Sequence, residues 1–356
     1  MQKLDSYVGK TIFMAMALVL LVLAGLDFLF TLFDEVAGVN ERYGMADATS
    51  YVLLTFPRHI YDLLPMTALM GSLIGLGILA SSNELVVMQA SGIKAGRIVW
   101  AVMKPAIVLM LLGLLLGEYL APAMELQAEV NKNISNSDDV VLSSSGTWQR
   151  DGDDFLHFNA IEPQGILHGV KIYRFNEAQQ MTANIVAEQA HFEDEQWLLQ
   201  DVRQTFFRHD ADGIQSETQT LDQLVWQSDL SPEMLQLMIM ESDKLTISDL
   251  YAYAQRFSNQ GQDASPYVLA FWEKLLQPLA TAALVLVAIS FIFGPLREAT
   301  MGARVFSGVM FGLGFIILQR LFNTVGAIYQ INPLLAVLIP IVLTLSIGFI
   351  LLRRAA

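Results

Sequence analysis

The first stretch of this sequence that could do chemistry is Gly9-Lys10-Thr11, because such a triplet closes the phosphate-binding loop of many nucleotide hydrolases. That loop needs another glycine five residues before this one, and a strand in front of it. The chain has Leu4 at the first position and its N-terminus where the strand would be. We therefore interpret the triplet as the positively charged start of a helix.

Other signatures of catalysis are missing from the sequence as well. The chain contains no cysteine, which excludes thiolate metal sites, disulfides and thiol nucleophiles. It has neither a histidine cluster with metal-ligand spacing nor a nucleophile elbow. We predict that the chain is no enzyme and that it binds no cofactor and no metal of its own.

The segment from Ser81 to Gly92 is more informative. Ser81 and Glu84 have the spacing of a capping box, and Gly92 can end a helix in the left-handed conformation, so a short helix is predicted within residues 81–92. Its apolar run is too short to span a membrane and too apolar for a solvated loop. It is either an interfacial turn on lipid or a coupling helix that docks into a groove of a soluble partner. The candidate coupling residues are Glu84, Leu85, Val86, Met88 and Gln89, with Glu84 as the charged anchor.

Asp27, Glu118 and Arg320 are ionisable residues inside apolar runs. Charge is costly to bury in a membrane, so such residues are candidates for function. Arg320 could meet a lipid phosphate or extend to the membrane surface. Glu118 could make a structural hydrogen bond or contact a substrate.

The composition requires a membrane as solvent, since 54% of the residues are hydrophobic and the mean hydropathy is +0.45. A helix needs about 20 apolar residues to cross a bilayer. Six runs approach or exceed this length: 11–33, 63–80, 98–120, 275–293, 305–325 and 334–352.

Basic residues near the helix ends set the orientation, because Lys and Arg resist translocation. One set of loops and both termini hold most of them, so this side is predicted to be cytoplasmic. The residues counted are Lys3, Lys10, Lys94, Arg97, Lys104, Arg297, Arg304, Arg353 and Arg354.

The segment 122–274 would then lie on the far side of the membrane. It holds 25 of the 35 acidic residues of a chain whose formal charge is −14, which argues against a nucleic-acid partner. Short alternating runs separated by Gly, Asn, Asp and Pro predict strands over 155–161, 170–175, 185–192, 197–207 and 216–226. An antiparallel sandwich or jelly roll with flanking helical segments is the expected architecture.

Three separated motifs resemble the lipopolysaccharide export permeases of the LptF/LptG family, specifically its LptG type. They are residues 84–92 (Glu-Leu-Val-Val-Met-Gln-Ala-Ser-Gly), residues 117–122 (Gly-Glu-Tyr-Leu-Ala-Pro), and residues 290–297 (Ser-Phe-Ile-Phe-Gly-Pro-Leu-Arg) followed by Met301-Gly302. The resemblance runs nearly end to end. It implies six transmembrane helices with an inserted periplasmic all-β jelly-roll domain, divided as 1–121 (helices one to three with the coupling helix), 122–274 (the jelly roll) and 275–356 (helices four to six).

The function implied by this resemblance is that of a permease subunit of an ABC transporter in the bacterial inner membrane. It would pair with an LptF-type subunit on an LptB-type ATPase dimer, which uses ATP and Mg, with an LptC-type protein beside the first helix. The complex would extract lipopolysaccharide and pass it to a periplasmic bridge of β-jelly rolls.

The resemblance further implies a substrate cavity between the two permease subunits, with the first and fifth helices at its gates. Family members carry basic residues near the outer end of helix one, where this chain has Thr31, Asp34 and Glu35. Phosphate would need bridging cations there, and Lys132 is the better candidate for a phosphate contact. The cavity and gate candidates are Asp27, Thr31, Asp34, Lys132, Phe311, Phe315, Leu318, Arg320 and Phe322.

Two other functions compete with this one. An ion-driven secondary transporter would place paired charges and broken helices near the bilayer midplane, whereas the charges in this chain lie mainly towards the helix ends. A membrane-anchored assembly scaffold would use the helices only as an anchor, and six helices with an apolar loop helix exceed that need.

Overall fold

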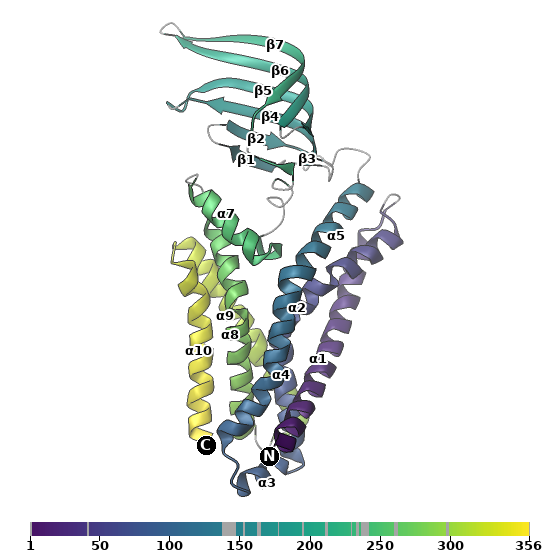
Figure 1. Cartoon of the computed structure of the whole chain (residues 1–356), viewed down its shortest axis with the longest axis vertical. Coiled ribbons are helices and arrows are strands. Elements are labelled where there is room, and N and C mark those ends of the chain that lie inside the picture. The colour runs from purple at the N-terminus through teal and green to yellow at the C-terminus, as the bar shows by residue number, and fades with distance from the viewer. Residues whose placement is uncertain are drawn as a thin grey trace. The chain divides into compact units, whose positions relative to one another are not determined.

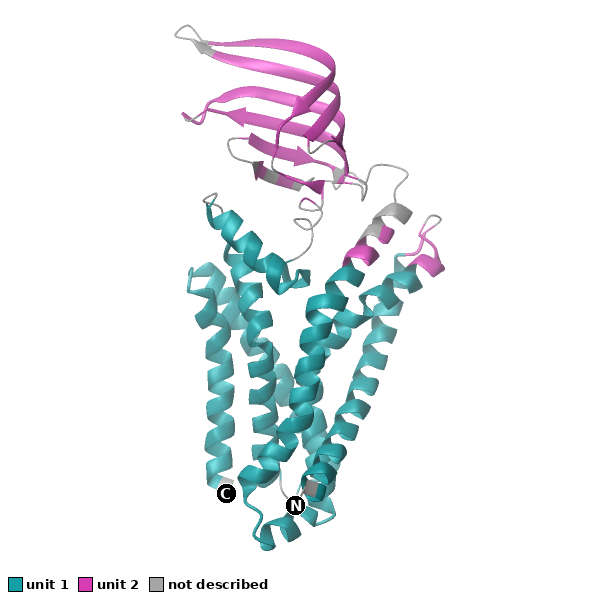
Figure 2. Cartoon of the chain, viewed as in Figure 1, with its two compact units in different colours: residues 1–38, 48–125, 242–356 teal, residues 39–47, 126–241 magenta. Residues whose placement is uncertain are grey.

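The computed structural model describes residues 2–40, 43–136, 147–151, 154–161, 165–176, 178–193, 196–210, 213–228, 230–232, 235, 242–259, 263–296 and 299–355. Arg297, one of the basic residues used for the orientation, lies outside them. The chain forms two compact units (Figure 2). Unit 1 comprises Met1–Gly38, Ala48–Glu125 and Ser242–Ala356, and unit 2 comprises Val39–Asp47 and Leu126–Glu241.

Unit 1 is a helix bundle. Within the described residues, six helices are long and apolar enough to cross a membrane, which confirms the six predicted spans. Both termini lie at the same end of this bundle (Figure 1). The spans are α1 (Gln2–Ala37), α2 (Met45–Ser81), the continuous stretch of α4 (Ala95–Leu115), η1 (Leu116–Leu120) and α5 (Ala121–Asn136), then α8 (Ser265–Phe293), α9 (Met301–Ile328) and α10 (Pro333–Ala355).

Helices α1, α2 and α8 begin well before the apolar runs that predicted them. α2 begins at Met45 rather than near residue 63, and α8 begins at Ser265 rather than near residue 275. Hydropathy misses the added turns because they carry charged residues. The difference matters, because these turns bring Arg58, Asp62 and Lys274 into the bundle.

Small residues allow α1 and α2 to pack closely. A side-chain carbon added at Gly71 would lie 2.6 Å from the Cα atom of Met16, and one added at Gly75 would lie 2.7 Å from Ile12 Cδ1. In a lipid bilayer the hydrophobic effect does not drive helices together, so helices associate through such close packing contacts. The two helices therefore behave as one packed pair.

Unit 2 contains an antiparallel sheet of seven strands among the described residues. Its order is β1-β2-β4-β5-β6-β7, with β3 paired to β4, so neighbouring strands also follow one another in the chain except at β2 and β4, which the short β3 separates. The predicted fold class, six helices with an inserted all-β domain, is confirmed, and the strand order, which the sequence left open, is that of a meander. The strands are β1 (Thr147–Asp151), β2 (Asp154–Phe158), β3 (Ala160–Ile161), β4 (Ile166–Phe175), β5 (Met181–Glu193), β6 (Gln196–Asp210) and β7 (Gly213–Trp226).

One face of this sheet is apolar. Trp197 and Trp226 are paired across β6 and β7, and both side chains are buried with Phe158. The indole N–H of Trp197 donates to the carbonyl of Leu230 at 2.7 Å, whereas the buried indole nitrogen of Trp226 has no hydrogen-bond partner among the described residues. The alternation of buried and exposed residues thus places one side of β2, β4, β5 and β6 in this core.

An ion pair fixes the first hairpin to its neighbour. The guanidinium of Arg174 on β4 binds both carboxylate oxygens of Asp154 on β2, at 2.8 and 2.7 Å. These hydrogen bonds raise the pKa of Arg174 above its ordinary value. The two-pronged geometry is the strong form of such a pair.

The boundary after the sheet differs from the predicted grouping. The predicted domain 122–274 includes residues 242–274. The compact unit that holds the sheet, however, ends at Glu241. The 3₁₀ turn η2 (Ser242–Lys244), helix α7 (Ile247–Asn259) and the start of α8 belong to unit 1. These segments are polar, so the sequence does not reveal the contacts that hold them in unit 1.

The two tryptophans supply a matched test of the sheet core. We expect Trp197→Phe to lower the free energy of opening β5 to β7 by about 1–3 kcal/mol more than Trp226→Phe does, because only the first change leaves a buried carbonyl without its donor. Hydrogen–deuterium exchange of the β5 to β7 amides in the full chain measures the difference. Equal losses in the two variants would contradict the role of the Leu230 contact.

Candidate functional site

The predicted loop helix is present as α3 (Glu84–Ala90). Its end is as predicted: Gly92 has φ +84°, its N–H donates to the carbonyl of Gln89 at 2.9 Å, and the N–H of Ile93 donates to Met88 at 3.1 Å. The predicted capping box is wrong. Ser81 is still the last residue of α2, so the chain turns through Asn83, which is left-handed and makes no side-chain cap.

The side chains of α3 divide between two faces. Leu85 and Met88 are only 5% and 6% exposed and belong to the core of unit 1, whereas Val86 and Val87 are 42% and 62% exposed. Leu85 and Met88 therefore pack inside the subunit rather than at a docking surface. We define the α3 surface as Val86, Val87 and the exposed Gln89.

Hydrogen bonds fasten α3 to α1 and α1 to α4. The carboxylate of Glu84 accepts from the hydroxyl of Ser82 at 2.9 Å and from that of Tyr7 on α1 at 3.3 Å. Asp5 on α1 pairs with Arg97 on α4 at 3.0 Å. The predicted anchor residue Glu84 is thus already part of an internal network.

Arg304 fastens α9 to α2 at the same end of the bundle. Its side chain is 3% exposed, and it donates to the carbonyl of Gly77 at 2.8 Å and to that of Leu296 at 3.3 Å. In the sequence, this arginine stands out only as one of the basic residues that set the predicted orientation. Gly77 lies four residues before the end of α2, so α9 is attached close to α3.

The gate candidates on α1 lie in different surroundings. Asp27 faces His59 on α2, with 2.8 Å between the carboxylate oxygen and Nδ1. Thr31 is half-buried and Asp34 is exposed. The described residues contain no group of three or more His, Asp or Glu side chains that could hold a metal ion.

The aromatic candidates on α9 share one side of the helix. Phe315 is buried, and Phe311 meets the ring of Phe291 edge to face with centroids 5.4 Å apart. Leu318 and Phe322 are half-buried, and Arg320 is exposed. Phe315 thus lines the interior of the subunit.

Lys132, the phosphate candidate of unit 2, lies over an aromatic ring. Its ammonium group is 5.8 Å from the centroid of Tyr43. A cation at this distance is attracted to the face of the ring. A phosphate contact would have to be made in addition to this one.

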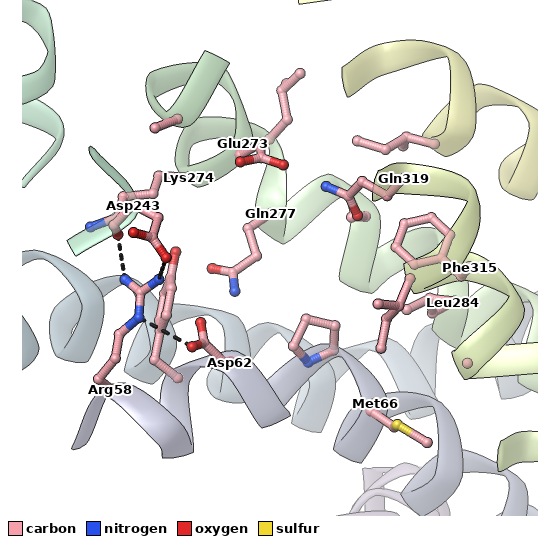
Figure 3. Close-up of a pocket in the computed structure, with 18 residues that line it drawn as sticks. Arg58, Asp62, Met66, Asp243, Glu273, Lys274, Gln277, Leu284, Phe315 and Gln319 are labelled. Carbon is pink, nitrogen blue, oxygen red and sulfur yellow. Dashed lines mark hydrogen bonds and ion pairs between the residues drawn. The ribbon is translucent and has the colours of Figure 1, made fainter. Parts of the chain in front are cut away.

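A charged cluster that the sequence did not predict lies at the other end of unit 1. We define it as Arg58, Glu118, Glu125 and Lys274, together with residues 243–248, which they hold. Arg58 on α2 donates to the main-chain oxygen of Asp243 at 2.5 Å and to its carboxylate at 3.2 Å, and also binds Asp62 at 3.1 Å. One arginine thereby ties α2 to η2 (Figure 3).

Other helices hold the same segment. Lys274 on α8 is 5% exposed and donates to the carbonyls of Leu245 and Gly117. The carboxylate of Glu118 accepts from the N–H of Ile247 at 2.8 Å, which satisfies a free donor at the start of α7. Lys244 pairs with the buried Glu125 at 3.2 Å. The hydrogen bond to Ile247 agrees with a structural role for Glu118.

A local distortion places Glu118 in the cluster. Residues 116–120 form the π-helical turn η1, an irregularity often found at functional sites. Gly117 in this turn lies against the ring of Tyr61, so a side chain there would collide with it. The absence of a side chain lets this span approach α2 and turns Glu118 towards α7.

Helix α7 is also held through its aromatic face. Tyr253 and Phe257 lie 5.8 and 4.9 Å from the ring of Tyr267 on α8, centroid to centroid. Burial, and the nearby carboxylate of Asp249, raise the pKa of Tyr253 to about 12. Its hydroxyl is therefore neutral at any physiological pH.

Two signals in the sequence could have revealed the cluster. Arg58 and Asp62 are four residues apart, the spacing of an ion pair on one helix face. Glu273 and Lys274 follow Phe271-Trp272, and aromatic residues mark membrane interfaces. Both pairs indicate that the helices continue past the apolar runs.

Comparison with known proteins gives a consistent result. The family model described as "Lipopolysaccharide export system permease LptF/LptG" matches residues 6–354. The lipopolysaccharide export system permease protein LptG of Escherichia coli (strain K12) is 36% identical over 355 residues, which cover 99% of this chain and 98% of that protein. The protein of the same name from Haemophilus influenzae (strain Rd) is 32% identical over 357 residues, with the same coverage.

The charged cluster makes a prediction at Glu118. We expect Glu118→Ala to lower the local opening free energy of α7 by about 1.5–3 kcal/mol, because the N–H of Ile247 loses a charged acceptor. Glu118→Gln keeps an acceptor oxygen and should lose less than half as much. Hydrogen–deuterium exchange of the amides of Ile247 to Leu250 measures both. Wild-type protection in the Ala variant would exclude the contact as a restraint on α7.

Proposed function

Because this chain belongs to the LptF/LptG family of lipopolysaccharide export system permeases, we propose that it is the LptG-type subunit of an ABC transporter. The transporter extracts lipopolysaccharide from the bacterial inner membrane and passes it to a periplasmic bridge of β-jelly rolls. The chain pairs with an LptF-type subunit and an LptC-type protein. An LptB-type ATPase dimer hydrolyses ATP with Mg, and this chain binds no cofactor of its own.

The observation that carries the proposal is the construction of α3. A helix of seven residues between two spans presents Val86 and Val87 outward while Leu85 and Met88 fix it to the core. Exposed apolar side chains on a rigidly held element suit docking into a groove on a soluble partner. Gln89 adds a polar contact at the rim of the α3 surface.

The contacts of α3 suggest how movement would spread. A closing ATPase dimer that displaces α3 also displaces α2 and α4, which are joined directly to it. The Tyr7 and Arg97 contacts include α1, and Arg304 includes α9. Displacement of α3 would thus reach the first and fifth spans, the proposed gate helices, by rigid-body motion.

The charged cluster would determine where this movement is restrained. It joins α2, η1 and α8 at the end of the bundle opposite α3 (Figure 1). Helices held at one end and displaced at the other tilt rather than translate. The space beside them would narrow from the α3 end, which moves a lipid towards the far side.

The same arrangement supports the proposed orientation. The termini and α3 share one end of unit 1 (Figure 1), and basic loop residues such as Lys94 and Arg97 belong to this end. The positive-inside rule favours the cytoplasm for this end, where an ATPase could reach α3. The sheet, inserted between α5 and η2, is then periplasmic.

The α3 surface is tested by Val87→Asp in the complex co-expressed with the ATPase and the LptF-type subunit. We expect the charge in an apolar contact to reduce ATPase co-purification at least about tenfold. Val87→Thr keeps the side-chain shape and should retain most of it. Glu84→Ala removes the contact to Tyr7 and should reduce ATP-driven lipopolysaccharide release.

The competing functions predict other results. A scaffold would show no associated ATPase in the wild type, and an ion-driven transporter would release lipid with no dependence on ATP. Either outcome would exclude the exporter. If Val87→Asp still associates normally with the ATPase, the α3 surface is not the docking site, but the exporter assignment is unaffected.

Arg304 supplies a separate test of the transmission route. We expect Arg304→Met to leave ATPase association intact and to lower lipopolysaccharide release per ATP hydrolysed by about tenfold, since the charged hydrogen bond from α9 to α2 is lost. Arg354→Met, at an exposed arginine near the C-terminus, is the control and should behave as wild type. Unchanged release in Arg304→Met would show that α9 is not driven through α2.

A further inference from the structure

A cavity of about 210 Å³ lies inside unit 1, between α2, α8, α9 and α10, next to the charged cluster. One end is charged and the other is apolar, with amide side chains between them (Figure 3). Engineered apolar cavities of roughly 150 Å³ already accept benzene. This cavity therefore has room for part of a small amphipathic molecule.

The charged end has no spare binding capacity for an ion. Arg58 is bound by Asp62 and Asp243, and Lys274 donates to two main-chain carbonyls. Glu273 accepts from the amide of Asn323. An anion would meet three carboxylates, and a cation would meet the positive charges of Arg58 and Lys274. The charged end therefore disfavours a charged ligand.

The middle of the cavity does have unused hydrogen-bonding groups. The side chains of Gln277 on α8 and Gln319 on α9 both extend towards it (Figure 3), and neither makes a hydrogen bond within the part of the chain that the structure describes. Each amide offers two donors and an acceptor oxygen. Half-buried groups of this kind favour a neutral partner that can both donate and accept.

The apolar end is shaped for a hydrocarbon. Met66, Leu284 and Phe315 line it, and Gly312 contributes no side chain. A carbon added at Gly312 would lie 3.3 Å from Leu69 and 3.5 Å from Met66, so a methyl group there would be in contact with both side chains. This region suits a flexible alkyl chain.

We propose that this cavity binds one alkyl chain that carries a neutral hydroxyl or ester group, with the chain against Met66, Leu284 and Phe315 and the oxygen atoms between Gln277 and Gln319. Two sources share this chemistry: a hydroxylated acyl chain of the exported lipid, or a separate neutral lipid such as a monoacylglycerol. The first source rests on the proposed function and the second does not.

Photo-crosslinking tests the site in the full-length chain with its membrane partners, reconstituted in lipid nanodiscs. The probe is a monoacylglycerol with a diazirine on its acyl chain, and peptide mass spectrometry locates the adducts. We expect adducts on the peptides that contain Met66, Leu284 and Phe315. Gln277→Leu with Gln319→Leu keeps the side-chain volume and should lower labelling there by about fivefold or more.

Two further variants separate binding from misfolding. Ala280→Phe fills the cavity from α8 and should abolish the adducts, while Leu111→Phe, on the exposed surface of α4, should leave them unchanged. Size-exclusion profiles and thermal unfolding midpoints must match wild type. If Ala280→Phe does not fold, the double glutamine variant decides. Equal labelling of that variant and the wild type would overturn the proposal, as would labelling spread evenly over lipid-exposed residues.

Competition identifies the source of the chain. If unlabelled lipopolysaccharide removes the adducts, the site holds a chain of the exported lipid. If only unlabelled monoacylglycerol removes them, the site belongs to a separate lipid. If neither competes, the labelling is not specific and the proposal fails. None of these measurements uses ATP, so they hold whether or not lipid release is observed.

Discussion

Buried charge is the constraint on which the rest of this structure depends. An ionised side chain in an apolar interior costs several kcal/mol unless charged or hydrogen-bonding partners surround it. Lys274 and Arg304 donate to main-chain carbonyls. Arg58 binds two carboxylates and a carbonyl, and Glu118 accepts from a main-chain N–H. Apart from Asp62, which shares α2 with Arg58, these partners lie outside the element that carries the charge, so satisfying the charge fixes the position of a second segment.

These charges occupy the two ends of the bundle, and small residues occupy its middle. Arg304 with Asp5 and Glu84 connects the helices around α3, and the charged cluster connects them at the other end. Between the two, Gly71 and Gly75 bring α1 and α2 into direct contact. Polar bonds therefore set the angles between helices, while close packing transmits force along them.

The sequence predicted what depends on local pattern. The lengths of the apolar runs predicted the six spans, and the alternation of apolar and polar residues predicted the strands. Gly92 predicted the end of α3. These features depend only on residues that are close together in the chain. It failed where distant partners decide the outcome. From the sequence alone, Arg58 and Lys274 look like loop residues, because their partners Asp243 and Leu245 are distant from Arg58 or Lys274 in the chain. Similarly, Leu85 and Met88 cannot be told from Val86 and Val87 until the core that receives them is known.

The interruption of unit 1 by the sheet has a consequence for how the chain is made. Residues 1–125 are inserted before the partners of Arg58 and Gly77 exist, because Asp243 and Arg304 come more than a hundred residues later. The sheet pairs strands that lie close together in the chain, so its contacts are local and it can fold early. Until residues 242–249 are made, Arg58 can bind Asp62 on its own helix, but the contacts that join α2 and η1 to these residues do not exist. The bundle therefore acquires its last polar contacts only after the sheet has been synthesised.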